Sequence, residues 1–101
     1  MDKALSYLSL AARAGRFAGG LDRTEKSVAG HKARLLLLAS DAGGDATRKL
    51  GRLAESAGLS VRSVPYTKLE IAAATGRAAP VAAAAVEDAG LAEAFLKALS
   101  N

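Results

Sequence analysis

The stretch "RLLLLAS", residues 34–40, decides the fold. Within the run at 34–39, four consecutive leucines followed by Ala39 leave no polar face after Arg34, which is typical of a strand buried on both sides. The run is far too short to cross a bilayer, which takes about 20 apolar residues. A strand that is buried on both sides requires a layer of helices on each face of its sheet.

Helix-like and strand-like patterns alternate around this run. They predict helices at 2–14, 22–29, 46–57, 67–75 and 89–100, and further strands at 16–18, 59–64 and 81–86. This alternation predicts an α/β fold, a single-domain three-layer α/β/α sandwich around a central mixed, largely parallel sheet. The alanine-rich strand at 81–86 should lie against closely packed helices.

Acidic residues mark the predicted helix starts. Asp22 and Glu25 have the spacing of a capping box, and Asp45 is a candidate N-cap. The adjacent Glu87 and Asp88 should cap the final helix. Apolar spacing predicts the buried faces of two helices: Leu50, Leu53, Ala54 and Ala57 in the third, and Leu91, Phe95, Leu96 and Leu99 in the last.

Composition limits the class of protein. The 101 residues suit one domain, and the core must be aliphatic because 50% of the residues are hydrophobic but only 4% are aromatic. The absence of cysteine excludes disulfides and thiolate chemistry. The N-terminus has no secretory pattern, so we expect a cytoplasmic protein.

Positive charge is concentrated in the first half of the chain. Residues 1–52 carry ten of the fourteen basic residues and five of the ten acidic ones, whereas residues 53–101 are slightly acidic. Such asymmetry favours a surface that faces a polyanion, although a solvated basic face would have the same composition.

Motifs for catalysis, metal binding or nucleotide binding are weak. Ser40, His31 and Asp41 could be drawn as a hydrolase triad, but neither an elbow motif nor a second histidine supports it, and His31 is expected to cover a helix end. The glycine-rich stretches match neither G-x-G-x-x-G nor Gly-Lys-Ser/Thr, and the acids do not cluster at metal-ligand spacing. We expect no enzyme, no cofactor and no metal.

The stretch "GGLDRTEKS", residues 19–27, is the best candidate site. Its two glycines let the backbone approach a ligand closely, and the helix start that follows offers free N–H groups to phosphate. Arg23 and Lys26 are three residues apart and so share one helix face, with Arg16 before them and Lys32 after. An ordinary solvated helix face would look similar. Aromatic platforms for stacking bases are missing from the stretch, which favours structured RNA held by its backbone.

The whole chain resembles the ribosomal-protein superfamily of L7Ae and L30e type, the kink-turn RNA binders, and is most similar to its small bacterial YlxQ-like branch. The resemblance follows the order of four blocks: "LSLAARAGRFAGG" (8–20), "ARLLLLASDAGGDATRKL" (33–50), "VPYTKLEIAAATG" (64–76) and "AVEDAGLAEAFLKAL" (85–99). It implies a three-layer α/β/α sandwich, the fold that the residue patterns also predict.

The resemblance implies an RNA-reading helix with the pattern Gly-X-Asn-Glu-X-X-Lys. In that pattern, Asn and Glu meet the sheared G·A pairs of a kink-turn and Lys meets phosphate. Gly20 and Lys26 match the pattern, but Asp22 stands in place of Asn and Arg23 in place of Glu. A carboxylate cannot donate as an amide does, and a guanidinium cannot accept, so kink-turn specificity is in doubt while phosphate contact survives.

The resemblance also implies a second RNA-facing element, the loop before the last strand. It corresponds here to "TGRAAP", residues 75–80. In this loop Gly76, Ala78 and Ala79 would lie beside the RNA, and Arg77 would add a phosphate contact.

The sequence therefore predicts a non-catalytic domain that binds structured RNA, kink-turn-like or ribosomal, mainly through backbone phosphates. We expect a monomer associated with the ribosome or with translation, with no membrane contact. The predicted RNA-binding residues are Arg16, Gly20, Asp22, Arg23, Lys26, Lys32, Gly76, Arg77 and Ala78. The alternative is a protein–protein interaction module on the same fold that has lost kink-turn specificity.

Overall fold

The leucine run forms the strand β2, Leu35–Leu38, and all four side chains are buried as predicted. Successive side chains of a strand point to opposite faces of the sheet. Leu35 and Leu37 therefore lie in one hydrophobic core, and Leu36 and Leu38 lie in a second core on the other face. Burying both faces of β2 requires helices on both sides of the sheet.

The computed structural model describes residues 2–100 as one α/β domain. Its helices are α1 (Lys3–Arg13), α2 (Leu21–Ala29), α3 (Gly44–Ala57), α4 (Lys68–Thr75) and α5 (Ala89–Ser100). The other strands are β1 (Phe17–Gly19), β3 (Val61–Ser63) and β4 (Ala83–Val86). None of the helices described over residues 2–100 is both long enough and apolar enough to cross a membrane.

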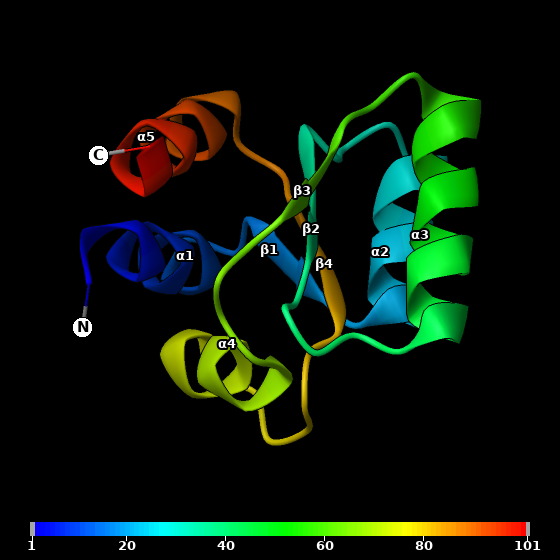
Figure 1. The fold of residues 1–101 in the computed structure, drawn as a ribbon. Helices are drawn as coiled ribbons and strands as arrows, with labels where there is room; N and C mark the ends of the chain where they lie inside the picture. Colours follow the sequence, from blue (N-terminus) through cyan, green and yellow to red (C-terminus); the bar gives the residue numbers. More distant parts are fainter. Residues whose placement is uncertain (1, 101) are drawn as a thin grey trace.

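Three layers are visible in Figure 1, as the sequence predicts. Helices α1, α4 and α5 cover one face of the sheet, and α2 and α3 cover the other (Figure 1). The core under α1, α4 and α5 contains Leu8, Ile71 and Phe95, and the core under α2 and α3 contains Leu50 and Ala54. The sandwich and the mixed sheet are confirmed.

The prediction of a largely parallel sheet is wrong. The strand order is β1-β4-β2-β3, and β4 runs antiparallel to both β1 and β2, so that only β2 and β3 pair in parallel. Strand β4 is inserted between two strands that precede it in the chain. Its alanines, opposite the leucines of β2 and the residues of β1, are small enough for close packing on both faces.

Two of the predicted helix caps are also wrong. The N-caps of α2 and α3 are Gly20 and Gly43, and neither helix has a side-chain cap. Asp22 and Asp45 are instead the second residues of their helices, where a carboxylate still meets the positive end of the helix dipole. The prediction for Asp88 is confirmed, because its Oδ1 accepts a hydrogen bond from the Leu91 N–H at 2.8 Å.

The predicted inner faces are largely correct. In α3, Leu50 and Ala54 are buried, but Leu53 is half-buried and Ala57, the last residue of the helix, is exposed. In α5, Phe95 is fully buried, and the three predicted leucines, Leu91, Leu96 and Leu99, pack around its core while partly exposed.

A buried tyrosine joins the start of α1 to the segment that precedes α4. The Tyr66 hydroxyl donates to Asp2 Oδ1 at 2.9 Å, and the same oxygen caps α1 by accepting from the Leu5 N–H at 2.8 Å. Burial, together with this hydrogen bond to a carboxylate, raises the pKa of Tyr66 to about 12. The neutral phenol is therefore favoured in the folded state.

Tyr66 should make the protein sensitive to alkali. Its pKa is raised in the folded state from an unfolded value of about 10. The corresponding stability is fully present below about pH 10 and is lost as the pH rises towards about 12. Urea unfolding of Tyr66→Phe should show lower stability than the natural chain near neutral pH, by about 1 kcal/mol, and a smaller decline between about pH 10 and about pH 12. Parallel pH profiles for the two proteins would contradict this role.

Candidate nucleic-acid interface

The turn from β1 into α2 depends on a backbone conformation that favours glycine. Gly20 has φ +99° and ψ 156°, a region that residues with a side chain rarely adopt. Its N–H donates to the Ala83 carbonyl at 2.8 Å, which ties the turn to the first residue of β4. The first hydrogen bond of α2 runs from the Thr24 N–H to the Gly20 carbonyl. With no side-chain cap, the N–H groups of the first turn of α2 are available to a ligand.

The loop at 76–80 is held against this turn by Arg77. The Arg77 Nη2 donates to the Gly19 carbonyl at 3.1 Å, and the Arg77 backbone N–H donates to Ala72 at 2.9 Å. A Cβ at position 19 would lie 3.1 Å from Arg77 Nε and 3.0 Å from the Phe17 ring, so any other residue would push against both side chains. Arg77 is therefore first a positioning residue between the two predicted RNA-facing elements.

The turn and the loop together line an open groove of about 570 Å³, which we call the Gly20 groove. Asp22 and Arg23 lie on the side of α2, and the loop supplies the other side. The full lining is Gly19, Gly20, Leu21, Asp22, Arg23, Gly76, Arg77, Ala78, Ala79, Pro80 and Val81. The fold thus brings together two elements that are more than fifty residues apart in the sequence.

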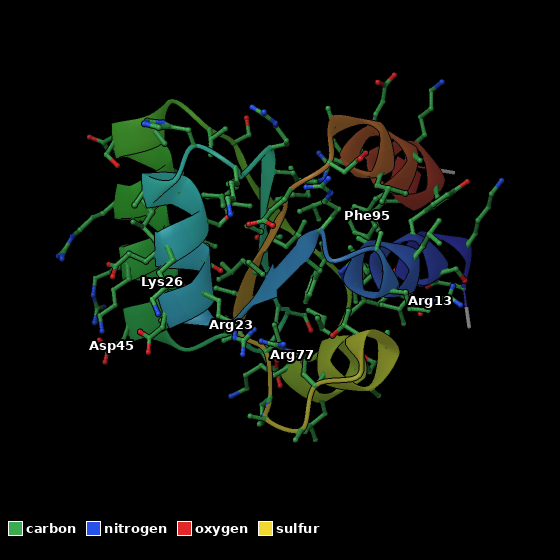
Figure 2. The ribbon with its side chains drawn as sticks, turned by 180° about the vertical axis from the view of Figure 1, so that it is seen from behind. Arg13, Arg23, Lys26, Asp45, Arg77 and Phe95 are labelled. Atoms are coloured by element: carbon green, nitrogen blue, oxygen red, sulfur yellow. The ribbon has the colours of Figure 1, made fainter. Side chains whose placement is uncertain are left out.

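A second hollow of about 430 Å³, the Ser27 pocket, lies along the same side of α2. Arg23 and Arg77 line both hollows and therefore join them into one surface. The lining of the Ser27 pocket is Ala12, Gly15, Phe17, Ala18, Arg23, Lys26, Ser27, Lys32, Arg77 and Glu87. Figure 2 shows Arg23 and Lys26 on α2 and Arg77 on the neighbouring loop, whereas Arg13 lies on α1 in the other helical layer.

The cations of this surface are available to a ligand. Arg23, Lys26 and Lys32 are exposed, and the only ion pair among residues 2–100 joins Arg48 to Asp45 on α3. Each hollow has one carboxylate in its lining, Asp22 in the Gly20 groove and Glu87 in the Ser27 pocket. Basic side chains outnumber these acids, so the joined surface favours an anionic ligand.

The structure assembles most of the predicted site but not all of it. The predicted residues from Gly20 to Lys26 line one or both hollows, as do Gly76, Arg77 and Ala78, and Lys32 joins Lys26 in the Ser27 pocket. Arg16 lies at the other end of β1 from Gly20, where its carbonyl accepts from the Glu87 N–H at 2.8 Å, and it lines neither hollow.

The structure adds two residues that the sequence-based site did not include, Gly19 and Ser27. The two consecutive glycines could have indicated that another side chain, here that of Arg77, approaches the backbone closely. Ser27 had a weaker signal: together with Thr24 it places hydroxyls on the side of α2 that is buried against the sheet.

The hydrolase triad is not assembled. His31 follows the C-cap of α2 and precedes β2, whereas Ser40 and Asp41 follow β2, so they lie at opposite ends of a strand. Asp41 instead accepts from the Lys68 N–H at the start of α4, at 2.8 Å. No group of three His, Cys, Asp or Glu residues within the described part of the chain could hold a metal ion.

Comparison with known proteins places this surface in context. A family model described as the ribosomal protein L7Ae/L30e/S12e/Gadd45 family matches residues 2–96. The chain belongs to this family. The resemblance inferred from the sequence blocks is therefore confirmed at the level of the family.

Two solved structures have a similar fold. A protein of unknown function from Bacillus halodurans is 29% identical with a TM-score of 0.87, and the match covers 100% of both chains. The 15.5 kD RNA binding protein of Giardia lamblia is 19% identical with a TM-score of 0.73, over 95% of this chain and 81% of that one. The second likeness shows the fold alone. No curated protein matches the sequence significantly.

Gly20 and Gly43 form a matched pair for testing the turn. Both are N-caps without side-chain hydrogen bonds, and a Cβ at either would meet nothing within 4 Å, but Gly43 has φ −74°. Gly20→Ala should therefore lower the free energy of unfolding by about 1–3 kcal/mol more than Gly43→Ala does. Urea denaturation followed by circular dichroism measures the difference. Equal losses of unfolding free energy in the two variants would show that alanine adopts the left-handed backbone at position 20 without strain.

Proposed function

We propose that this chain is a non-catalytic domain that binds structured RNA, mainly through backbone phosphates. The observation that carries the proposal is that Arg23 and Arg77 join the Gly20 groove and the Ser27 pocket into one basic surface next to the start of α2. Membership of the L7Ae/L30e family supports RNA as the anion, as does the shared fold of a Giardia protein that is named as RNA-binding.

Phosphate contacts follow from the chemistry of this surface. The ammonium of Lys26 and the guanidinium of Arg23 each neutralise one backbone phosphate, and the N–H groups at the start of α2 donate to another. No aromatic residue lines the Gly20 groove, so stacking of single-stranded bases contributes little there. The RNA is therefore recognised by the shape of its backbone.

Discrimination between RNAs is expected to be weak. Asp22 and Arg23 line the Gly20 groove at the positions where the resemblance implies Asn and Glu. Asp22 offers acceptors only and Arg23 offers donors only, which inverts the hydrogen bonding that a sheared G·A pair would need. Electrostatic attraction then supplies most of the binding energy, and affinity falls steeply with salt.

The cellular role is part of the same proposal. The family description includes ribosomal proteins, which supports work on ribosomal RNA or in translation. We propose in addition that the protein acts in the cytoplasm as a monomer. The changed residues at Asp22 and Arg23 also favour a second candidate, a protein-interaction module on the same fold.

A titration separates the two candidates. A kink-turn RNA, a plain duplex and a single strand are each titrated with the protein at low and at moderate salt. We expect comparable binding to the kink-turn and the duplex, weaker binding to the single strand, and a steep loss of affinity with salt. Failure to bind any RNA at low salt would leave the protein-interaction module as the better account.

Lys26 provides the first mutational test. Lys26→Glu should lower RNA affinity about tenfold or more and reduce the slope of log affinity against log salt by at least about one, because it removes a phosphate contact and adds repulsion. Lys97→Glu, which reverses an exposed charge on α5 in the opposite layer, is the matched control and should change RNA affinity little. Equal effects of the two changes would place the interface elsewhere.

Asp22 and Arg23 provide the second test. The double change Asp22→Asn with Arg23→Glu creates the pattern that the resemblance implies for reading sheared G·A pairs. We expect the ratio of kink-turn to duplex affinity to rise about tenfold or more, since each good polar contact to a base contributes about 1–3 kcal/mol of discrimination. An unchanged ratio would mean that these positions do not face the bases.

A further inference from the structure

Ser27 carries an unsatisfied hydroxyl. Its side chain is only 3% exposed, yet Ser27 Oγ is the one buried side-chain nitrogen or oxygen among residues 2–100 that has no hydrogen-bond partner. The nearby Thr24, also buried in α2, does reach a partner, the Ala18 carbonyl at 3.5 Å. Buried polar groups are nearly always paired in folded proteins, so the hydroxyl of Ser27 points to a partner from outside the chain.

The side chains around Ser27 indicate that this partner is an anion. Arg23, Lys26, Lys32 and Arg77 line the same pocket, against a single carboxylate from Glu87. An anion in this pocket would pair with several of these exposed cations at once, whereas a neutral or cationic ligand would not. The pocket therefore combines one buried donor with an excess of positive charge.

The backbone holds Lys32 close to Ser27. The Lys32 N–H donates to the Ser27 carbonyl at 2.9 Å, and the Ala33 N–H reaches the same oxygen at 3.4 Å. The chain after α2 is thus folded back onto the end of the helix, so that Lys26 and Lys32 both enter the pocket although they lie on either side of the helix end.

We propose that the Ser27 pocket is a binding site for a phosphate group. On binding, the Ser27 side chain turns towards the pocket so that Oγ–H donates to one phosphate oxygen, and the ammonium groups of Lys26 and Lys32 pair with the others. Glu87 opposes the binding of a second negative charge. The phosphate comes from an RNA backbone, in which case the site deepens the proposed function and rests on it, or from a free phosphate compound.

The first experiment uses inorganic phosphate and dimethyl phosphate as probes, followed by the amide signals of the full chain in NMR at constant ionic strength. We expect saturable shifts around Ser27 and Lys32 that sodium chloride does not reproduce. Ser27→Ala should weaken binding about tenfold, and Glu87→Gln should strengthen it. Ser56→Ala, which removes an exposed hydroxyl from α3, is the control and should behave like the natural chain. Shifts that chloride reproduces, or that Ser27→Ala leaves unchanged, would overturn the site.

The second experiment repeats the comparison with duplex RNA. A drop in RNA affinity of about five- to tenfold in Ser27→Ala, with none in Ser56→Ala, identifies the backbone as the source of the phosphate. Unchanged RNA affinity together with Ser27-dependent phosphate shifts identifies a free phosphate compound. If no RNA binds but those shifts persist, the proposed function fails and the site stands.

Thermal unfolding separates binding from folding. Because Ser27 Oγ has no partner among residues 2–100, Ser27→Ala should leave the melting temperature unchanged or raise it while weakening phosphate binding. A lower melting temperature with unchanged phosphate binding would assign Ser27 a purely structural role and overturn the proposal.

Discussion

The conformation at Gly19–Gly20 is the constraint on which the candidate interface depends. Gly20 turns the chain from β1 into α2 with a left-handed φ and is tied to β4 through the Ala83 carbonyl. Gly19 has no side chain, which lets the Arg77 guanidinium reach its carbonyl and hold the loop at 76–80 in place. A side chain at position 20 would disturb the start of α2, and one at position 19 would disturb the loop at 76–80. Both hollows are lined by residues of α2 and of this loop.

Much of the fold follows from local sequence, but strand direction does not. Four leucines without a polar face predict a strand buried on both sides, and the structure places it between two cores. Alternating helices and strands do not encode where a returning strand is inserted, and β4 enters between β1 and β2 and runs antiparallel to both. The caps at Asp22 and Asp45 were predicted wrongly because glycines directly before each helix take the N-cap position.

Part of the candidate site could be predicted from the sequence, and part could not. The shared helix face of Arg23 and Lys26 follows from their spacing, and both line the Ser27 pocket. The role of Arg77 in joining the loop to Gly19 depends on a contact between residues 58 positions apart, which no local pattern reveals. The unpaired hydroxyl of Ser27 is likewise a consequence of how α2 packs on the sheet. These long-range contacts give the proposed phosphate-binding surface its shape, while the proposal attributes weak reading of bases to Asp22 and Arg23.

Mapping the RNA contact onto the chain tests the central claim most directly. Backbone amide shifts would be recorded while duplex RNA is added to the full chain at low salt. The account predicts that the shifts concentrate at Gly20–Lys26, Lys32 and Gly76–Ala79, the residues around the two hollows. Shifts concentrated on α1, α4 and α5, or no shifts at all, would contradict it.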